Sequence, residues 1–453
     1  MTHGVGAAAE TVRRWLGAVG EFASVPSAEG AVGCPVSAWA ASGVMELTGD
    51  ADGPPVLSPA SVLPLLHEVG AALASLTASA GRPVHIDPAL LLGGRAAVLG
   101  LTRRGRTSAG GATRLLPTGD GWCAVTLSRP DDIDLVPAIL GRADVGDPWQ
   151  ALAAAAAHDG AEELAARIRL FGVPSAALPS VLPALDAPWR VSSIAAPGAG
   201  TRLDGALVVD FSSLWAGPLC AHLLGRAGAR VVKVESTRRP DGARSGDRRF
   251  FDWLHDGHES VAVDFTSAGG RAALADLVRA ADVVIEASRP RAFAELGLSP
   301  ERLDHRAGKV WISITGYGRR QPDLVALGDD AAVAGGLVGR SEGRPVFCGD
   351  AIADPLTGVV AALGAAGSLV AGGGHLVDVA MREVAAAFAG FSAAGHGPHP
   401  VRRSAAGWYV ECPLLGRRQA VLPPRVPERG GEAVAMGADT TRVLAEVRAA
   451  FGL

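Results

Sequence analysis

The sequence predicts an α/β fold in which a parallel β-sheet is interleaved with helices. From Gly205 onward, helical stretches alternate with continuous apolar runs, namely ALVVDF, RVVKVE, SVAVDF, DVVIEA and KVWISITGYG. Such runs are typical of strands that are buried on both faces. Strands that alternate with helices at roughly 30 residues per unit indicate βαβ crossovers. Residues 203–320 are therefore predicted to form a Rossmann-like sheet, whose ligands are expected at the carboxyl ends of the strands.

The composition narrows the class of protein. With 453 residues, 48% of them hydrophobic and 19% charged, the chain is long and apolar enough for two or three folded domains. A formal charge of −4 without a basic block argues against nucleic acid as a partner. The N-terminal segment carries Glu10 and two arginines in a helical pattern, so a signal peptide is not predicted. The run PLTGVVAALGAAGSLVAGGG is interpreted as a buried helix, and no membrane partner is expected.

The five cysteines are dispersed and none lies in a CxxC motif; they are Cys34, Cys123, Cys220, Cys348 and Cys412. An odd, scattered set favours a reducing compartment over a disulfide framework. We therefore expect a cytoplasmic protein without a metal site.

Two segments of the chain resemble each other. PPVLSPASVLPLLHEVGAALASL, from Pro54, aligns without a gap on RPVFCGDAIADPLTGVVAALGAA, from Arg344. The aligned residues are 290 positions apart, and the flanking segments are similar as well. This pattern indicates a partial internal repeat. In the first copy, Pro64 stands where the second copy has Asp354.

Asp354 permits two interpretations. An Asp-Pro pair before an apolar helix is typical of an N-cap followed by proline at the first helical position. The same position suits a carboxylate nucleophile, because free N–H groups and the helix dipole would hold its pKa low and keep it ionised. The first copy does without a cap at Pro64, which favours the functional interpretation but leaves both open.

The motifs of the second half, taken together, resemble the class III coenzyme A transferases, the CaiB/BaiF family. The resemblance covers about residues 205–390 and is carried by LVVDFSSLWAGPLCAHLLGRAGARVVKVE, SVAVDF, DVVIEASRP, ELGLSPERL, ISITGYG and IADPLTGVVAALGA. It implies that Asp354 attacks an acyl-CoA thioester and that CoA passes to a carboxylic acid through acyl-aspartyl anhydride and aspartyl-CoA intermediates. Coenzyme A would be a substrate, with no permanently bound cofactor, and the chain would form an interlocked homodimer.

The resemblance also implies a domain order and a smaller α+β domain. The expected divisions are a degenerate, helical N-terminal repeat packing on the large domain (1–104), a small domain (105–195), a large Rossmann-like CoA-binding catalytic domain (196–400), and a remnant small-domain strand with the C-terminal segment (401–453). A tandem fusion with internal deletions accounts for this permuted order. A degenerate, inactive relative is the alternative.

Further site residues follow from the resemblance. Asp330 keeps an acidic position of the family and is a second catalytic candidate, with an N-cap role as its alternative. Asp329 stands where the family's racemases have a catalytic histidine, which argues against an α-methylacyl-CoA racemase. The remaining CoA- and substrate-binding candidates are Trp215 and Ala216 in the first strand–helix turn, Arg238, Arg239, Arg289 and Arg291 after two strands, and Gly110 and Gly111 in a glycine loop. Their alternatives are core packing for Trp215, solvated surface positions for the arginines and an ordinary surface turn for the glycines.

Three functions remain open from the sequence. The first is an acyl-CoA:carboxylate CoA-transferase, the second a racemase-like enzyme, and the third a non-catalytic CoA-binding homologue. The absence of a GxSxG motif argues against a serine hydrolase. The acyl group and the acceptor acid are not specified by the sequence.

Overall fold

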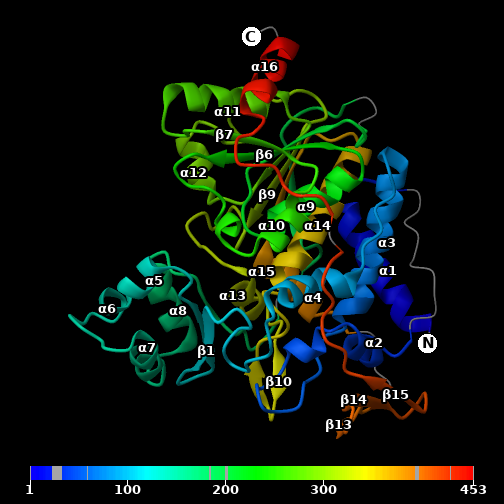
Figure 1. The fold of residues 1–453 in the computed structure, drawn as a ribbon, viewed down its shortest axis with the longest axis vertical. Helices are drawn as coiled ribbons and strands as arrows, with labels where there is room; N and C mark the ends of the chain where they lie inside the picture. Colours follow the sequence, from blue (N-terminus) through cyan, green and yellow to red (C-terminus); the bar gives the residue numbers. More distant parts are fainter. Residues whose placement is uncertain are drawn as a thin grey trace.

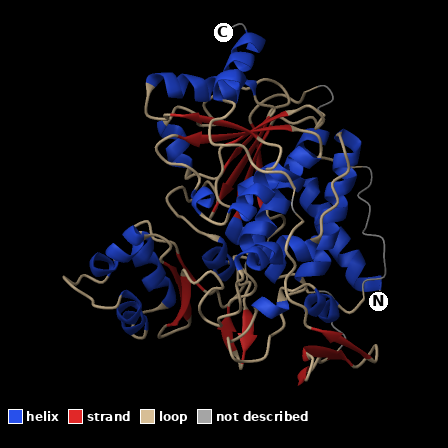
Figure 2. Cartoon of the chain, in the orientation of Figure 1, coloured by secondary structure: helices blue, strands red, loops and turns tan. Residues whose placement is uncertain are grey.

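The computed structural model describes residues 2–22, 33–58, 60–182, 185–198, 202–392, 397–428 and 430–451. The chain is a mixed α/β protein built around one large, mostly parallel sheet (Figure 1). Three smaller sheets lie away from it, at the lower end of the molecule in Figure 2.

The large sheet has seven strands in the order β4-β12-β9-β8-β5-β6-β7. All neighbours are parallel except β4, which pairs antiparallel with β12 at one edge. The strands are β4 Trp189–Ser193, β5 Leu207–Asp210, β6 Arg230–Ser236, β7 Glu259–Val263, β8 Val283–Glu286, β9 Val310–Thr315 and β12 His375–Ala380. The five strands predicted between residues 206 and 318 are therefore confirmed, while β4 and β12 were not part of that prediction.

Helices cover both faces of this sheet, as crossover connections require. The helices of the second half are α9 Ala216–Arg226, α10 Arg248–His255, α11 Ala268–Ala280, α12 Pro290–Glu295, α13 Gly328–Ala334, α14 Ala353–Val370, α15 Met381–Ala389 and α16 Thr440–Phe451, with the 3₁₀ turn η2 Gly242–Ser245. Successive residues of a strand point to opposite faces of the sheet. In β5, the side chain of Val208 packs in the apolar core formed with α9 and α14, and that of Val209 packs in the core formed with α11 and α16.

The described residues of the first hundred form helices that pack on the large-sheet core. They are α1 Thr2–Gly17, α2 Pro35–Ala41, η1 Met45–Leu47, α3 Val62–Ala80 and α4 Pro88–Leu99. Helix α3 packs directly against α14, its counterpart in the internal repeat. A shift of 290 residues carries α3 onto 352–370, within one residue of α14. The two copies of the repeat are therefore neighbours in space.

Residues 113–177 contain a separate antiparallel sheet with short helices, which Figure 1 shows beside α13 and away from the large sheet. Its elements are β1 Thr113–Pro117, β2 Trp122–Thr126, α5 Pro130–Asp134, α6 Val136–Ile139, α7 Pro148–Ala156, α8 Ala161–Arg169 and β3 Ser175–Ala177. Helix α8 packs on β2 and β3 around its own apolar cluster.

Two further small sheets complete the described fold. Strands β10 Gly339–Ser341 and β11 Arg344–Val346 form a hairpin before α14. Strands β13 Val401–Ser404, β14 Gly407–Cys412 and β15 Arg417–Ala420 form a three-stranded sheet that packs on α2.

Helices α3 and α14 are long and apolar enough to cross a membrane, by length and composition alone. Buried residues make up 72% of the apolar window of α3 and 89% of that of α14. Core helices pass the same test, and both helices contribute to the core cluster of the large sheet.

Candidate active site

Asp354 lies in the first turn of α14, but it is not the cap of that helix. The helix begins at Ala353, with Ile352 at the N-cap position, so the predicted N-cap role of Asp354 is wrong. The preceding Ala351 has a φ of 42°, in the left-handed region that residues with a Cβ rarely adopt. The helix therefore starts two residues earlier than the Asp-Pro pair indicates, at Ala353 and not at Pro355.

Four aspartates surround the start of α14. Asp350 is buried in the preceding loop, and Asp329 and Asp330 lie in the first turn of α13. Asp329 Oδ1 accepts a hydrogen bond from Ala351 N at 3.0 Å, which ties the first turn of α13 to the loop before α14. Asp354 and Asp329 are half-buried, whereas Asp330 is fully buried.

Arg95, from α4 of the first repeat, is the cation of this cluster. Its Nη1 donates to both carboxylate oxygens of Asp350, at 2.7 and 2.8 Å. Its guanidinium also lies 5.4 Å from the Trp215 ring centroid and 5.7 Å from that of Phe250. The first repeat therefore supplies the charge that faces the carboxylates of the second.

Burial has the largest effect on the pKa values of Asp354 and Asp329. It raises the pKa of Asp354 to about 7, with Asp329 and Asp350 adding to the rise and Arg95 opposing it. Burial and Asp350 raise the pKa of Asp329 to about 6. The prediction that the helix terminus holds the pKa of Asp354 low is wrong, because loss of water and neighbouring carboxylates outweigh the dipole. Near neutral pH, Asp354 is shared between its charged and neutral forms.

Gly328, the first residue of α13, allows the Asp354 carboxyl group to sit against the backbone. A Cβ at this position would overlap Asp354 Oδ2 and the backbone oxygen of Ala351. The backbone N–H of Gly328 also acts on Asp354 as a hydrogen-bond donor that lowers its pKa. A residue other than glycine would displace the carboxylate.

Asp330 connects the site to the small sheet. Its Oδ1 accepts hydrogen bonds from Leu327 N at 2.9 Å and from Thr126 Oγ1 at 3.1 Å. Burial raises its pKa to about 7. Asp330 is thus more deeply buried than Asp329 and Asp354, and its catalytic role stays a prediction.

The glycine loop reaches the same cluster. Gly110 and Gly111 lie in the turn before β1, and Gly111 has a φ of 85° with its N–H bonded to Ser108 O at 2.8 Å. The Ser108 hydroxyl lowers the pKa of Asp329, against the larger effect of burial, and Thr113 Oγ1 lies 3.4 Å from Asp329 Oδ2. The structure therefore brings the predicted loop to the edge of the carboxylate cluster.

Trp215, at the N-cap of α9, and Ala216, its first residue, follow the carboxyl end of β5, where a parallel sheet offers its ligand site. Trp215 is buried edge-on against Phe250, with its indole nitrogen unpartnered in the described structure. Ala216 begins α9. Leu214, just before them, has a φ of 71° and donates its N–H to Asp241 Oδ1 at 3.0 Å. Their substrate contacts stay a prediction.

The four predicted phosphate-binding arginines are exposed and follow the carboxyl ends of β6 and β8. Arg238 pairs with Asp264 at 3.1 Å, and Arg291 lies 3.4 Å from Glu295. Arg239 and Arg289 project from the adjoining turns. The four therefore lie at the surface, two of them in the turn after β6 and two at the start of α12.

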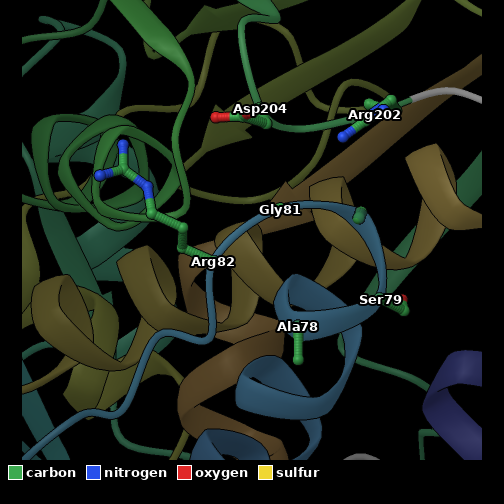
Figure 3. Close-up of a pocket in the computed structure, with 7 residues that line it drawn as sticks. Ala78, Ser79, Gly81, Arg82, Arg202 and Asp204 are labelled. Atoms are coloured by element: carbon green, nitrogen blue, oxygen red, sulfur yellow. The ribbon is translucent and has the colours of Figure 1, made fainter.

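Two cavities among the described residues have linings that do not include Asp354. A cavity of about 720 Å³ is lined by the end of α3 and by Arg82, Arg202 and Asp204, around the turn at Gly81 (Figure 3). Asp204 precedes β5, so this cavity lies at the amino ends of the strands, opposite the ligand end. A second cavity of about 150 Å³ lies beside the start of α3.

Sequence reasoning missed Arg95 altogether. Arg95 is the single charged residue in the apolar helix α4, PALLLGGRAAVL. A lone charge in a helix that packs in a core is an indication of a buried partner. Nothing in the sequence points to Asp350 as that partner, because the two residues are 255 positions apart.

Comparison with known proteins identifies related chains over part of the length. Residues 203–452 match the family model described as CoA-transferase family III. An acyl-CoA transferase of Fusarium pseudograminearum is 31% identical over 40% of this chain and 45% of its own length. The succinate–glutarate CoA-transferase of Agrobacterium fabrum is 30% identical over 42% of this chain and 54% of its own. The chain thus spans about half the length of these relatives.

A CAIB/BAIF family protein from Brucella suis is 23% identical and superposes with a TM-score of 0.42, covering 47% of this chain and 66% of that one. The family model spans more than half of the present sequence. The chain therefore belongs to CoA-transferase family III.

Proposed function

We propose that this protein transfers coenzyme A from an acyl-CoA thioester to a carboxylic acid, with Asp354 as the nucleophile. The observation that carries the proposal is the position of Asp354, which is half-buried at the start of α14. Its carboxyl group lies against Gly328 of α13, where a Cβ would not fit, and the charge of Arg95 acts on it to lower its pKa. The family membership supports the reaction class.

In the first step, the ionised Asp354 carboxylate attacks the thioester carbonyl and the C–S bond breaks. The products are an acyl-aspartyl anhydride and a CoA thiolate. The thiolate then attacks the aspartyl carbonyl, which releases the first acid as a carboxylate and leaves an aspartyl-CoA thioester. The acceptor acid reverses these two steps and leaves with CoA, so that Asp354 is regenerated and no oxidant or external proton is consumed.

In the proposed reaction the Asp354 side chain is negatively charged before attack and uncharged while it is acylated, and its surroundings suit both states. Arg95 lowers the pKa of Asp354 and so favours the attacking carboxylate, while burial and Asp329 raise it and favour the neutral acylated states. Exclusion of water would also protect the anhydride from hydrolysis.

The test is to incubate the full chain with acyl-CoA and then treat it with hydroxylamine or borohydride. Peptide mass spectrometry should find a modified Asp354, and Asp354→Asn should show neither the adduct nor CoA exchange. A panel of acyl-CoAs and acids, read by mass spectrometry, identifies the substrates. Deuterium exchange at the α-carbon without CoA transfer would instead support a racemase-like enzyme, and acyl-CoA binding without either reaction a non-catalytic homologue.

The proposal includes a homodimer in the cytoplasm. The family resemblance supports the dimer, and the scattered cysteines support a reducing compartment. Sedimentation of the purified chain at several concentrations tests the oligomeric state. A monomer at all concentrations would contradict it.

A further inference from the structure

Two cysteines and a histidine that are far apart in the sequence meet at the junction of α2 and the β13–β15 sheet. Cys34 directly precedes α2, His399 precedes β13, and Cys412 is the last residue of β14. Cys34 Sγ lies 3.0 Å from His399 Nε2, and one ligand atom from each of the three residues lies within 4.8 Å of the others. Spacing in the sequence gave no indication of this cluster.

The chemistry of the three side chains is that of a zinc site. Thiolate sulfur and imidazole nitrogen are preferred zinc ligands, at about 2.3 and 2.0–2.1 Å from the ion. In a tetrahedron of these dimensions the sulfur–nitrogen edge is about 3.6 Å, so Cys34 and His399 need to separate by only about half an ångström. Both thiols are buried and His399 is half-buried, so the ion would be largely shielded from solvent.

A cavity adjoins the cluster on the side of His399. It measures about 150 Å³, enough for several waters, and its lining includes His399, Trp39 and Pro64. The indole N–H of Trp39 is buried and unpartnered among the described residues. A zinc site with three protein ligands keeps its fourth position for water or a small ligand, and this cavity provides the room.

The cavity occupies the place in the first repeat that the Asp354 cluster occupies in the second. Pro64 corresponds to Asp354 and Ala60 to Asp350 at the repeat offset of 290, and both line the cavity. The first repeat therefore lacks the carboxylates and has the thiol–imidazole cluster beside the equivalent position.

We propose that Cys34, His399 and Cys412 bind one Zn²⁺ ion, whose fourth position is filled by water from the adjacent cavity. On binding, each thiol releases its proton to solvent, and two thiolates neutralise the ion. The ion fastens the β13–β15 sheet to α2, and through α2 to the first repeat. This site is separate from the Asp354 cluster and does not depend on the proposed transferase activity.

The test uses the full chain, stripped with a chelator and titrated with Co²⁺ alone. We expect saturation at one ion per chain, with a sulfur-to-cobalt charge-transfer band in the near ultraviolet and the visible bands of tetrahedral Co²⁺. Protein purified without a chelator should contain about one zinc per chain by elemental analysis. Zinc should raise the unfolding temperature of the stripped protein.

Cys34→Ser and Cys412→Ser should each weaken the charge-transfer band, and the double variant should abolish it. The matched control is Cys123→Ala, a buried cysteine in the small sheet far from the cluster. Circular dichroism checks that each variant is folded. Cobalt titration of the stripped wild-type chain tests the site independently of any substitution. A wild-type chain that binds no cobalt, an unchanged band in the double variant, or a Cys34–Cys412 disulfide in the purified protein would overturn the proposal.

Discussion

Arg95 of the first repeat donates hydrogen bonds to both carboxylate oxygens of Asp350, four residues before Asp354. The arginine side chain remains 25% exposed, whereas the Asp350 side chain is 1% exposed. Asp354 and Asp329 are half-buried, so both remain partly accessible beside this pair. One copy of the repeat thus completes the candidate site of the other.

The first prediction concerns the pH dependence of the proposed reaction. Because the attacking form is the carboxylate and the pKa of Asp354 is raised to about 7, kcat/KM should fall about tenfold per pH unit below that value. Arg95→Gln removes a charge that lowers this pKa, so the acidic limb should move to higher pH. Asp329→Asn removes a charge that raises it, so the limb should move to lower pH.

The measurement is kcat/KM for CoA exchange between pH 5 and 9 in the wild type and both variants. The two variants serve as controls for each other, because their shifts have opposite signs. Limbs that coincide in all three proteins would show that Asp354 is not the titrating group.

The second prediction concerns Gly328. Gly328→Ala places a methyl group where Asp354 Oδ2 and the Ala351 backbone lie, so the carboxylate must move. A displacement of about 1 Å at a reacting group lowers kcat by about a hundredfold. Gly269→Ala is the control, since its added methyl group meets nothing within 4 Å. Steady-state kinetics should show full activity for the control, and equal activity in the two variants would contradict the prediction.

The third prediction compares the two lysines of the chain, both of which are buried. Burial alone would lower the pKa of Lys233, but Asp210 and Asp241 raise it above its usual value, and Lys233 Nζ bonds Asp241 Oδ2 at 2.9 Å. Lys233→Met leaves Asp241 buried without its cation, at a cost of about 3–5 kcal/mol in the free energy of unfolding.

Lys309 has backbone partners and, among the described residues, no carboxylate partner as close as Asp241 is to Lys233. Its Nζ donates hydrogen bonds to the carbonyl oxygens of Val278 and Arg279 at the end of α11. Burial lowers its pKa to about 8. Lys309→Met removes these charge-assisted hydrogen bonds but leaves no carboxylate of the described residues unpaired, so the free energy of unfolding should fall by less, about 1.5–3 kcal/mol. Urea denaturation at pH 7 measures both values. Similar losses in the two variants would contradict the role assigned to the carboxylates.

The fourth prediction concerns acid stability. Burial, with His222 and Lys233 nearby, lowers the pKa of His258 from 6.5 to about 3. The unfolded chain therefore binds a proton that the folded chain excludes between these values, and the folded state loses up to about 1.4 kcal/mol per pH unit as the pH falls below 6.5.

The His258→Asn variant has no imidazole at this position and so does not lose stability in this way. Any advantage of the wild type in the free energy of unfolding should therefore shrink, or reverse, as the pH falls from 6.5 to 4. The exposed His158→Asn variant should show no such trend. Urea denaturation at several pH values measures this difference in the free energy of unfolding. The carboxylates are the same in both proteins, so their contribution to the pH dependence cancels in the difference. A difference independent of pH would contradict the prediction.

The sequence by itself determined the parallel sheet, because strands such as β6 and β9 are buried on both faces and leave continuous apolar runs between helices. It also indicated the repeat and drew attention to Asp354, since the residues of each repeat copy and the Asp-Pro pair can be recognised within short stretches of sequence. It could not determine that α14 starts at Ala353, because that start depends on the strained turn at Ala351, which the tertiary contact with Asp329 holds.

Only the tertiary structure decided the environment of the site. The pKa of Asp354 depends on burial and on Asp329, Asp350 and Arg95, which three separate segments of the chain bring together. The cluster of Cys34, His399 and Cys412 was likewise hidden, because its members are joined by packing of α2 on β14 and not by spacing along the chain. Local patterns specify strands and helices, whereas the charges around Asp354 and the thiol–imidazole cluster depend on contacts between separate segments, such as Arg95 with Asp350 and Cys34 with His399.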